Sequence, residues 1–243
     1  MSENFKDFYR LEKTLCLFLI WEQLDHRGDQ RYDTFLASVL TEKTLQLPKE
    51  ISVVSWNYDS QFEIAYHNYS NNRLYVFDKY SDIETLPSCG RIFKVNGSAS
   101  FREIPTPLEI ISETEDKGLA ILWYYRQTEV NIDIDGFEQI TPRLSFAWEQ
   151  VEENEKMMKA INNTVQDAVA LVVIGYSFPF FNRNIDREIF GYMDRLETIY
   201  IQDPFAEEIK QNIQNVLSDI QKVQRIAIIT KTNCGQFFLP PEL

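Results

Sequence analysis

Small and polar residues directly follow four short apolar runs, and side chains of these types can hold and orient a polar ligand. Ligands bind open parallel sheets just beyond the carboxyl ends of the strands, so four such ends would converge on one crevice. The residues are Ser55, Asn57 and Asp59 after the first run, Asn96, Gly97 and Ser98 after the second, Gly175, Ser177 and Phe178 after the third, and Asp203 after the fourth.

Each residue also has a structural explanation of its own. Asp59 and Asp203 can cap the helices that follow them, and Gly97 and Gly175 can serve tight turns. The two explanations stay open for each residue taken alone. Four such groups in this order favour a binding crevice.

The elements that must position these residues follow from apolar periodicity. Helical spacing predicts helices over residues 4–25, 32–40, 59–69, 145–170, 184–196 and 204–223. Short apolar runs predict strands over residues 51–56, 74–77, 91–95, 119–124, 171–174, 198–201 and 226–230. The alternation predicts an α/β, Rossmann-like fold with a mostly parallel sheet and helices on both faces.

The domain organisation follows from length and local composition. A chain of 243 residues predicts one domain, 1–243, with a helical N-terminal part over residues 1–45. Residues 100–142 are rich in proline, glutamate and isoleucine, and we expect them to form a small inserted lobe.

Charge and cysteine usage exclude several classes of protein. The formal net charge is −13, which argues against direct binding to a nucleic-acid backbone. No apolar run is long enough to span a membrane, and the charged first ten residues do not predict a secretory signal. The three cysteines form neither a disulfide framework nor a zinc half-site, so we expect reduced thiols, a cytoplasmic location and no metal site.

The order of the four groups resembles the SIR2 (sirtuin) family, particularly the SIR2-like domains of bacterial antiphage-defence proteins. That family carries T-x-N-x-D after a strand, then H-G-S, then G-T-S or G-Y-S-x, then a strand with a polar end. Here the matching segments are S-W-N-Y-D at 55–59, N-G-S at 96–98, G-Y-S-F at 175–178 and Q-D at 202–203. The phrase V-V-I-G-Y-S-F-P at 172–179 is the most distinctive, and the resemblance covers residues 51–230.

The resemblance implies NAD as the cofactor. Asn57 and Asp59 would lie near the nicotinamide ribose and carboxamide as the catalytic pair, where an amide and a carboxylate can orient the cationic ring. Gly175 and Ser177 would approach a ribose or phosphate, and Asp203 would accept from a ribose hydroxyl. Cleavage of the glycosidic bond would then need a general base to activate water or another acceptor. The rest of the implied cofactor-binding set is Ser55, Asn96, Gly97, Ser98 and Phe178.

Two departures from the family pattern bear on activity. The family opens with a strand and a G-A-G-x-S loop that cradles the pyrophosphate, whereas no glycine precedes Gly28 here. The chain has 8 glycines in 243 residues, about half the roughly 7 % of average proteins. Asn96 stands where the family has its general-base histidine, and an amide cannot act as that base. The sequence therefore predicts either the remainder of a longer protein or a domain with half a cofactor site.

Three functions follow as hypotheses. The leading one is a partial or catalytically degenerate SIR2-like domain, a bacterial pseudoenzyme that binds NAD or ADP-ribose. The second is an active NAD glycohydrolase of a defence system, working once assembled with a second copy or a partner subunit. The third is a non-catalytic interaction protein with a vestigial crevice.

Overall fold

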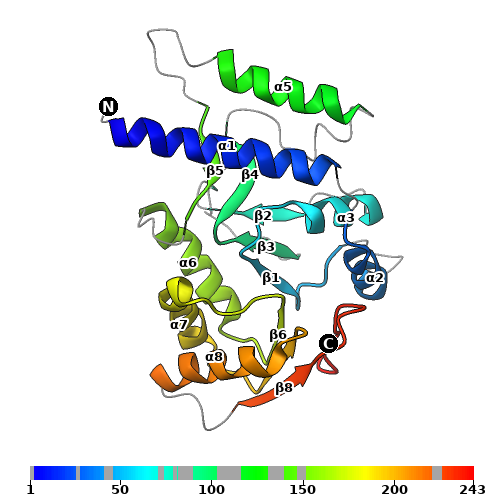
Figure 1. Ribbon diagram of the computed structural model, residues 1–243. Helices are drawn as coiled ribbons and strands as arrows, with labels where there is room; N and C mark the ends of the chain where they lie inside the picture. Colours follow the sequence, from blue (N-terminus) through cyan, green and yellow to red (C-terminus); the bar gives the residue numbers. More distant parts are fainter. Residues whose placement is uncertain are drawn as a thin grey trace.

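Helices and strands alternate along most of the chain, and the fold is α/β and Rossmann-like as predicted (Figure 1). The computed structural model describes residues 3–25, 28–40, 46–70, 74–78, 81, 90–102, 116–130, 140–146, 152–220 and 226–243. The helices are α1 (Glu3–Asp25), α2 (Gln30–Val39), α3 (Gln61–Ser70), α5 (Lys117–Val130), α6 (Glu152–Val165), the 3₁₀ turn η1 (Phe180–Asn182), α7 (Arg183–Tyr192) and α8 (Ala206–Asp219). The strands are β1 (Ser52–Ser55), β2 (Tyr75–Phe77), β3 (Arg91–Lys94), β4 (Gly97–Phe101), β5 (Pro142–Leu144), β6 (Ala170–Ile174), β7 (Thr198–Gln202) and β8 (Ala227–Lys231).

The strands form two parallel sheets and one antiparallel pair. The first sheet has the order β1-β3-β2, the second has the order β6-β7-β8, and β4 pairs with β5. All pairings within the two three-stranded sheets are parallel, so their carboxyl ends lie along one edge of each sheet. The parallel character matches the prediction, but the strands are divided between separate sheets.

Alternate side chains of the first sheet enter different cores. Phe93 of β3 joins the core shared with α6, α7 and α8, whereas its neighbour Ile92 joins the core beneath α2 and α3. The period-two geometry of a strand causes this division. Helices therefore cover both faces of this sheet.

The second sheet shares the first of these cores. Val173 of β6 and Ile199 of β7 lie in it with side chains from α6, α7 and α8. On the opposite face the C-terminal segment covers the sheet, because the ring of Tyr200 packs 4.7 Å from that of Phe238 and its hydroxyl donates to Glu242 at 3.0 Å. One apolar layer thus joins the two parallel sheets.

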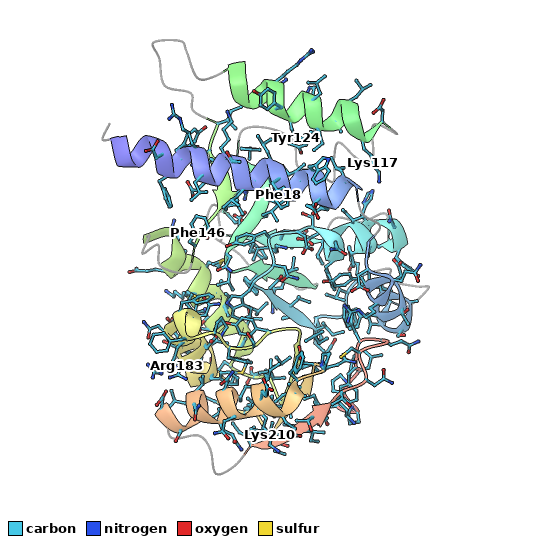
Figure 2. The ribbon with its side chains drawn as sticks, viewed as in Figure 1. Phe18, Lys117, Tyr124, Phe146, Arg183 and Lys210 are labelled. Atoms are coloured by element: carbon cyan, nitrogen blue, oxygen red, sulfur yellow. The ribbon has the colours of Figure 1, made fainter. Side chains whose placement is uncertain are left out.

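A third core lies around α1, β4, β5 and α5. Cys16 and Ile20 of α1 pack there with Ala120 and Tyr124 of α5, and Tyr124 lies on the side of α5 that faces α1 (Figure 2). The strands β4 and β5 flank residues 100–142, the predicted lobe, and pair with each other at its base. Residues 103–115 and 131–139 of that segment lie outside the described part of the chain.

One predicted element is wrong, and another has the wrong bounds. Residues 119–124 lie within α5 and not in a strand, because a short apolar run has no decisive period and Asp116 caps the helix by accepting from Leu119 N at 3.0 Å. The predicted helix over 145–170 is present as α6, with the bounds Glu152–Val165, and residues 147–151 lie outside the described part of the chain. Its expected first residue, Ser145, instead donates its backbone N–H to Asn96 O at 2.8 Å, and its expected last residue, Ala170, begins β6.

The helices of the described ranges include none with both the length and the apolar character that crossing a membrane requires.

Candidate functional site

The segments after β1 and β3 are held together at one edge of the first sheet. Asn96 Nδ2 donates to the carbonyl oxygen of Trp56 at 3.1 Å, and Val95 N donates to Ser55 O at 2.9 Å. A further backbone bond joins Ala99 N to Tyr58 O at 2.8 Å. The first two predicted groups are therefore neighbours in space.

An aromatic stack joins this edge to the second sheet. The rings of Trp56, which follows β1, and Tyr176, which follows β6, lie 4.3 Å apart with an interplanar angle of 21°. Tyr176 also packs edge-on against Phe178 at 4.7 Å. The carboxyl ends of β1, β3 and β6 thus converge, as the sequence predicts, although the sheets are separate.

Three of the predicted residues are exposed along this edge: Asn57, Gly175 and Ser177. Gly175 has a φ of 62°, and a Cβ built on it would meet no heavy atom within 4 Å. This backbone conformation is rare for residues with side chains, and the space above it is open. A ligand can approach the backbone of the chain at this point.

Three other predicted residues serve packing. Gly97 has a φ of 74°, and a Cβ there would lie 1.8 Å from the carbonyl oxygen of Arg143. The Ser98 hydroxyl is buried in a hydrogen bond of 2.8 Å with that of Ser100, and Phe178 is buried in the core. The structure gives Gly97, Ser98 and Phe178 a part in holding the edge together.

The Asp59 side chain lies in a groove that is separate from the edge with Asn57 and Gly175. Its Oδ1 accepts from the N–H of Gln61, the first residue of α3, at 3.1 Å, and Asp59 lies one residue before Ser60, which occupies the cap position expected for Asp59. Asp59 lines this groove of about 940 Å³ between α1, α2, α3 and α5, where Asp33 and Lys117 lie as well. Asn57 is not among the residues that line this groove. The predicted catalytic pair is therefore divided between the exposed edge and the groove.

Two polar side chains lie at the end of β7: Gln202, which binds the C-terminal segment, and Asp203, which is half-buried. Gln202 is buried, and its amide binds the C-terminal segment through Asn233 O at 2.7 Å, Gln236 O at 2.6 Å and Phe238 N at 2.9 Å. Asp203 is half-buried, and its Oδ1 accepts from Phe205 N at 2.8 Å. Asp203 therefore does not cap α8 as expected, because the N-cap of α8 is Phe205, and its carboxylate instead bonds the turn that precedes the helix.

A buried polar network behind Tyr176 was not expected from the sequence. The Tyr176 hydroxyl donates to Asp186 Oδ1 at 2.9 Å and accepts from Asn182 Nδ2 at 3.0 Å. Asp186 is 2 % exposed, and this burial raises the pKa of its carboxyl to about 7. Burial and the nearby Asp186 raise the pKa of the Tyr176 hydroxyl as well. The signal in the sequence is an aspartate on the apolar stripe of α7, three and four residues before Ile189 and Phe190.

A buried lysine lies beneath the segment after β1. Lys94, the last residue of β3, is 1 % exposed, and its Nζ lies 3.4 Å from Glu63 Oε1 and donates to the carbonyl oxygen of Asp59. Its signal in the sequence is a charge inside the apolar run I-F-K-V at 92–95. Apolar neighbours on both sides predict burial, but not which carboxylate pairs with the lysine.

No three His, Cys, Asp or Glu side chains of the described ranges form a cluster that could hold a metal ion. Comparison of the chain with protein-family models, with curated proteins and with solved structures found no match.

Proposed function

We propose that this chain is a SIR2-like domain that binds NAD or ADP-ribose across the carboxyl ends of β1, β3, β6 and β7 without turning NAD over. The observation that carries the proposal is the stack of Trp56 on Tyr176, because it brings two motif segments about 120 residues apart to one edge. The motifs S-W-N-Y-D and G-Y-S-F supply the family resemblance at that same edge.

The residues at this edge fit a dinucleotide in their chemistry. The exposed amide of Asn57 can donate to and accept from a ribose or carboxamide, and the Ser177 hydroxyl can bond a phosphate oxygen. The open space above Gly175 admits the ligand to the backbone, and Asp203 has a second carboxylate oxygen for a ribose hydroxyl. When bound, NAD would supply a cationic nicotinamide ring, whereas the Asp59 carboxylate lines the separate groove between α1, α2, α3 and α5.

The absence of turnover in this proposal rests on Asn96. Its amide nitrogen donates to the Trp56 carbonyl, and an amide has no proton that titrates near neutral pH. Asp186 does titrate near neutral pH, but its carboxyl is buried and engaged by the Tyr176 hydroxyl. Asn96 therefore links the segment after β3 to the segment after β1, and it does not act as a base. Within the described part of the chain, the Asn96 position thus supplies no base for hydrolysis of NAD at this edge.

The proposal includes a cytoplasmic location, which the cysteines support. The Cys16 thiol is buried and donates to Ser100 O at 3.2 Å, and its pKa is raised by burial and by Glu12. A buried thiol of this kind is unreactive and suits a reducing compartment.

Thermal shift with increasing NAD and ADP-ribose tests the proposal on the intact chain. We expect saturable stabilisation of the wild type, and affinity reduced roughly three- to ten-fold by Asn57→Ala or Ser177→Ala, since each removes one hydrogen bond to the ligand. Matched controls are Asn163→Ala on α6 and Ser218→Ala on α8, which remove the same exposed groups elsewhere. No shift in the wild type at millimolar ligand, or equal shifts in all variants, would contradict the proposed site.

A further inference from the structure

Lys94 occupies an unusual position for a charged residue. It ends the central strand of the first sheet and pairs in register with Ser55, the last residue of β1. Its side chain follows Ile92 in the strand alternation and therefore points to the α3 side of the sheet. The ammonium group reaches the start of α3, beneath the segment that carries Asn57 and Asp59.

The contacts of Lys94 join two parts of this region. Nζ donates to the backbone carbonyl of Asp59, two residues before α3, and lies 3.4 Å from the carboxylate of Glu63 one turn further along. Both side chains of the pair are almost fully buried, at 1 % and 7 % exposure. Glu63 thus balances the buried charge, whereas the hydrogen bond to Asp59 fixes the backbone of the loop.

A buried ion pair is a poor way to gain stability, because apolar side chains of similar volume often stabilise the same site equally well or better. The pair is not needed to bury area, since Ile92 and Phe93 already fill both faces of β3. What an apolar replacement could not supply is the donor to the Asp59 carbonyl. The hydrogen bond from Lys94 to the Asp59 carbonyl therefore indicates that Lys94 positions the loop and does not only stabilise the fold.

We propose that Lys94 is a positioning residue for the nucleotide site, which holds the loop of residues 56–59 in its binding geometry through the Asp59 carbonyl. The importance of this loop for a nucleotide rests on the proposed function. The Glu63 carboxylate, 3.4 Å away, holds the ammonium group close to that carbonyl.

Three variants separate positioning from stability. Lys94→Met leaves the Glu63 carboxylate buried without its partner, and we expect Tm to fall by roughly 10 °C. The double variant Lys94→Met with Glu63→Met removes both charges, and we expect Tm to return to within about 5 °C of the wild type. The matched control is Arg187→Gln with Asp219→Asn, which removes an exposed ion pair between α7 and α8.

The decisive readouts are made on the folded double variant. Hydrogen exchange followed by mass spectrometry should show amides of residues 56–59 exchanging at least about ten-fold faster than in the wild type, with α7 and α8 unchanged. Affinity for NAD should fall at least about ten-fold, while the control pair changes neither quantity.

The outcomes distinguish this inference from the proposed function. Exchange at residues 56–59 equal to that of the wild type would overturn the positioning role, whatever the affinity. Faster exchange with wild-type affinity would overturn the link between this loop and the nucleotide. Faster exchange in a chain whose wild type binds no nucleotide would uphold the role of Lys94 in the loop and refute the proposed function.

Discussion

Replacing Asp186 by asparagine should change how the stability of this protein depends on pH. The carboxyl lies on the buried side of α7 with 2 % exposure, and one of its oxygens accepts from the Tyr176 hydroxyl. Asparagine has nearly the same shape and keeps an oxygen for that hydroxyl, but it cannot ionise. The variant therefore isolates the free energy of ionising a buried carboxyl.

The sign follows from the raised pKa. Burial raises the pKa of Asp186 from 3.8 to about 7, so the folded state binds the proton more tightly than the unfolded state. This contribution to stability is fully present below pH 3.8 and is lost as the pH rises through 7. A shift of about three pH units, at about 1.4 kcal/mol for each, corresponds to about 4 kcal/mol. Asp186→Asn should be more stable than the wild type by about 1 kcal/mol at pH 4.5 and by about 4 kcal/mol at pH 8.

Urea unfolding of both proteins at several pH values between 4.5 and 8 measures this difference, and all other titrating groups cancel in the comparison. The control is Asp167→Asn, an exposed carboxylate beside Arg195, for which the difference should stay within about 0.5 kcal/mol throughout. A difference for Asp186→Asn that stays constant with pH, or a wild type that is the more stable protein at pH 8, would refute the reasoning.

Two further substitutions test how the edge is held. Gly97→Ala should lower the free energy of unfolding by about 3 kcal/mol in urea, because the added Cβ would lie 1.8 Å from the Arg143 carbonyl oxygen and φ is 74°. The control is Gly191→Ala, at an open position in α7, which should be neutral or stabilising. Equal changes in the free energy of unfolding for the two variants would contradict this explanation. Arg143→Met should lower the free energy of unfolding by about 3–5 kcal/mol, because the guanidinium donates to both carboxylate oxygens of buried Asp78 at 2.7 Å. A decrease below about 1 kcal/mol would show that this ion pair contributes little to stability.

Apolar patterning was sufficient to predict most of the fold. The runs that end in Val95 and Ile174 are too short for buried helices and are rich in β-branched or aromatic residues, and both regions are strands. The pattern fails at residues 119–124, where all six side chains are apolar or aromatic and therefore fit the period of a strand and that of a helix equally well. The Asp116 cap and the packing of Ala120 and Tyr124 on α1 favour the helix, and the packing contact is tertiary.

The proximity of the strand ends could be predicted from the sequence, but the contacts of their residues could not. The strand-end rule brought Ser55, Asn96 and Tyr176 to one edge, because parallel strands place their carboxyl ends together. It could not show that Gly97 is closed off by the Arg143 carbonyl, since β4 and β5 were not predicted. Nor could it show that Asp59 turns towards the groove beneath α1. These facts depend on segments that lie far apart in the sequence.

Buried charges mark the limit of prediction from sequence most clearly. Lys94 and Asp186 each interrupt an apolar pattern, which indicates that they are buried. Their partners, Glu63 and Tyr176, lie on other elements and follow from no local rule. A charge within an apolar stripe therefore predicts that a partner exists without naming it.

One calorimetric titration of the intact chain with NAD, followed by measurement of free nicotinamide in the same sample, tests the central claim most directly. The account predicts a saturable heat signal with one site per chain and no nicotinamide above the level of a protein-free sample. Absence of any binding heat at millimolar NAD would contradict binding at this edge, and release of nicotinamide would contradict the assignment of Asn96 as a structural link in an inactive site.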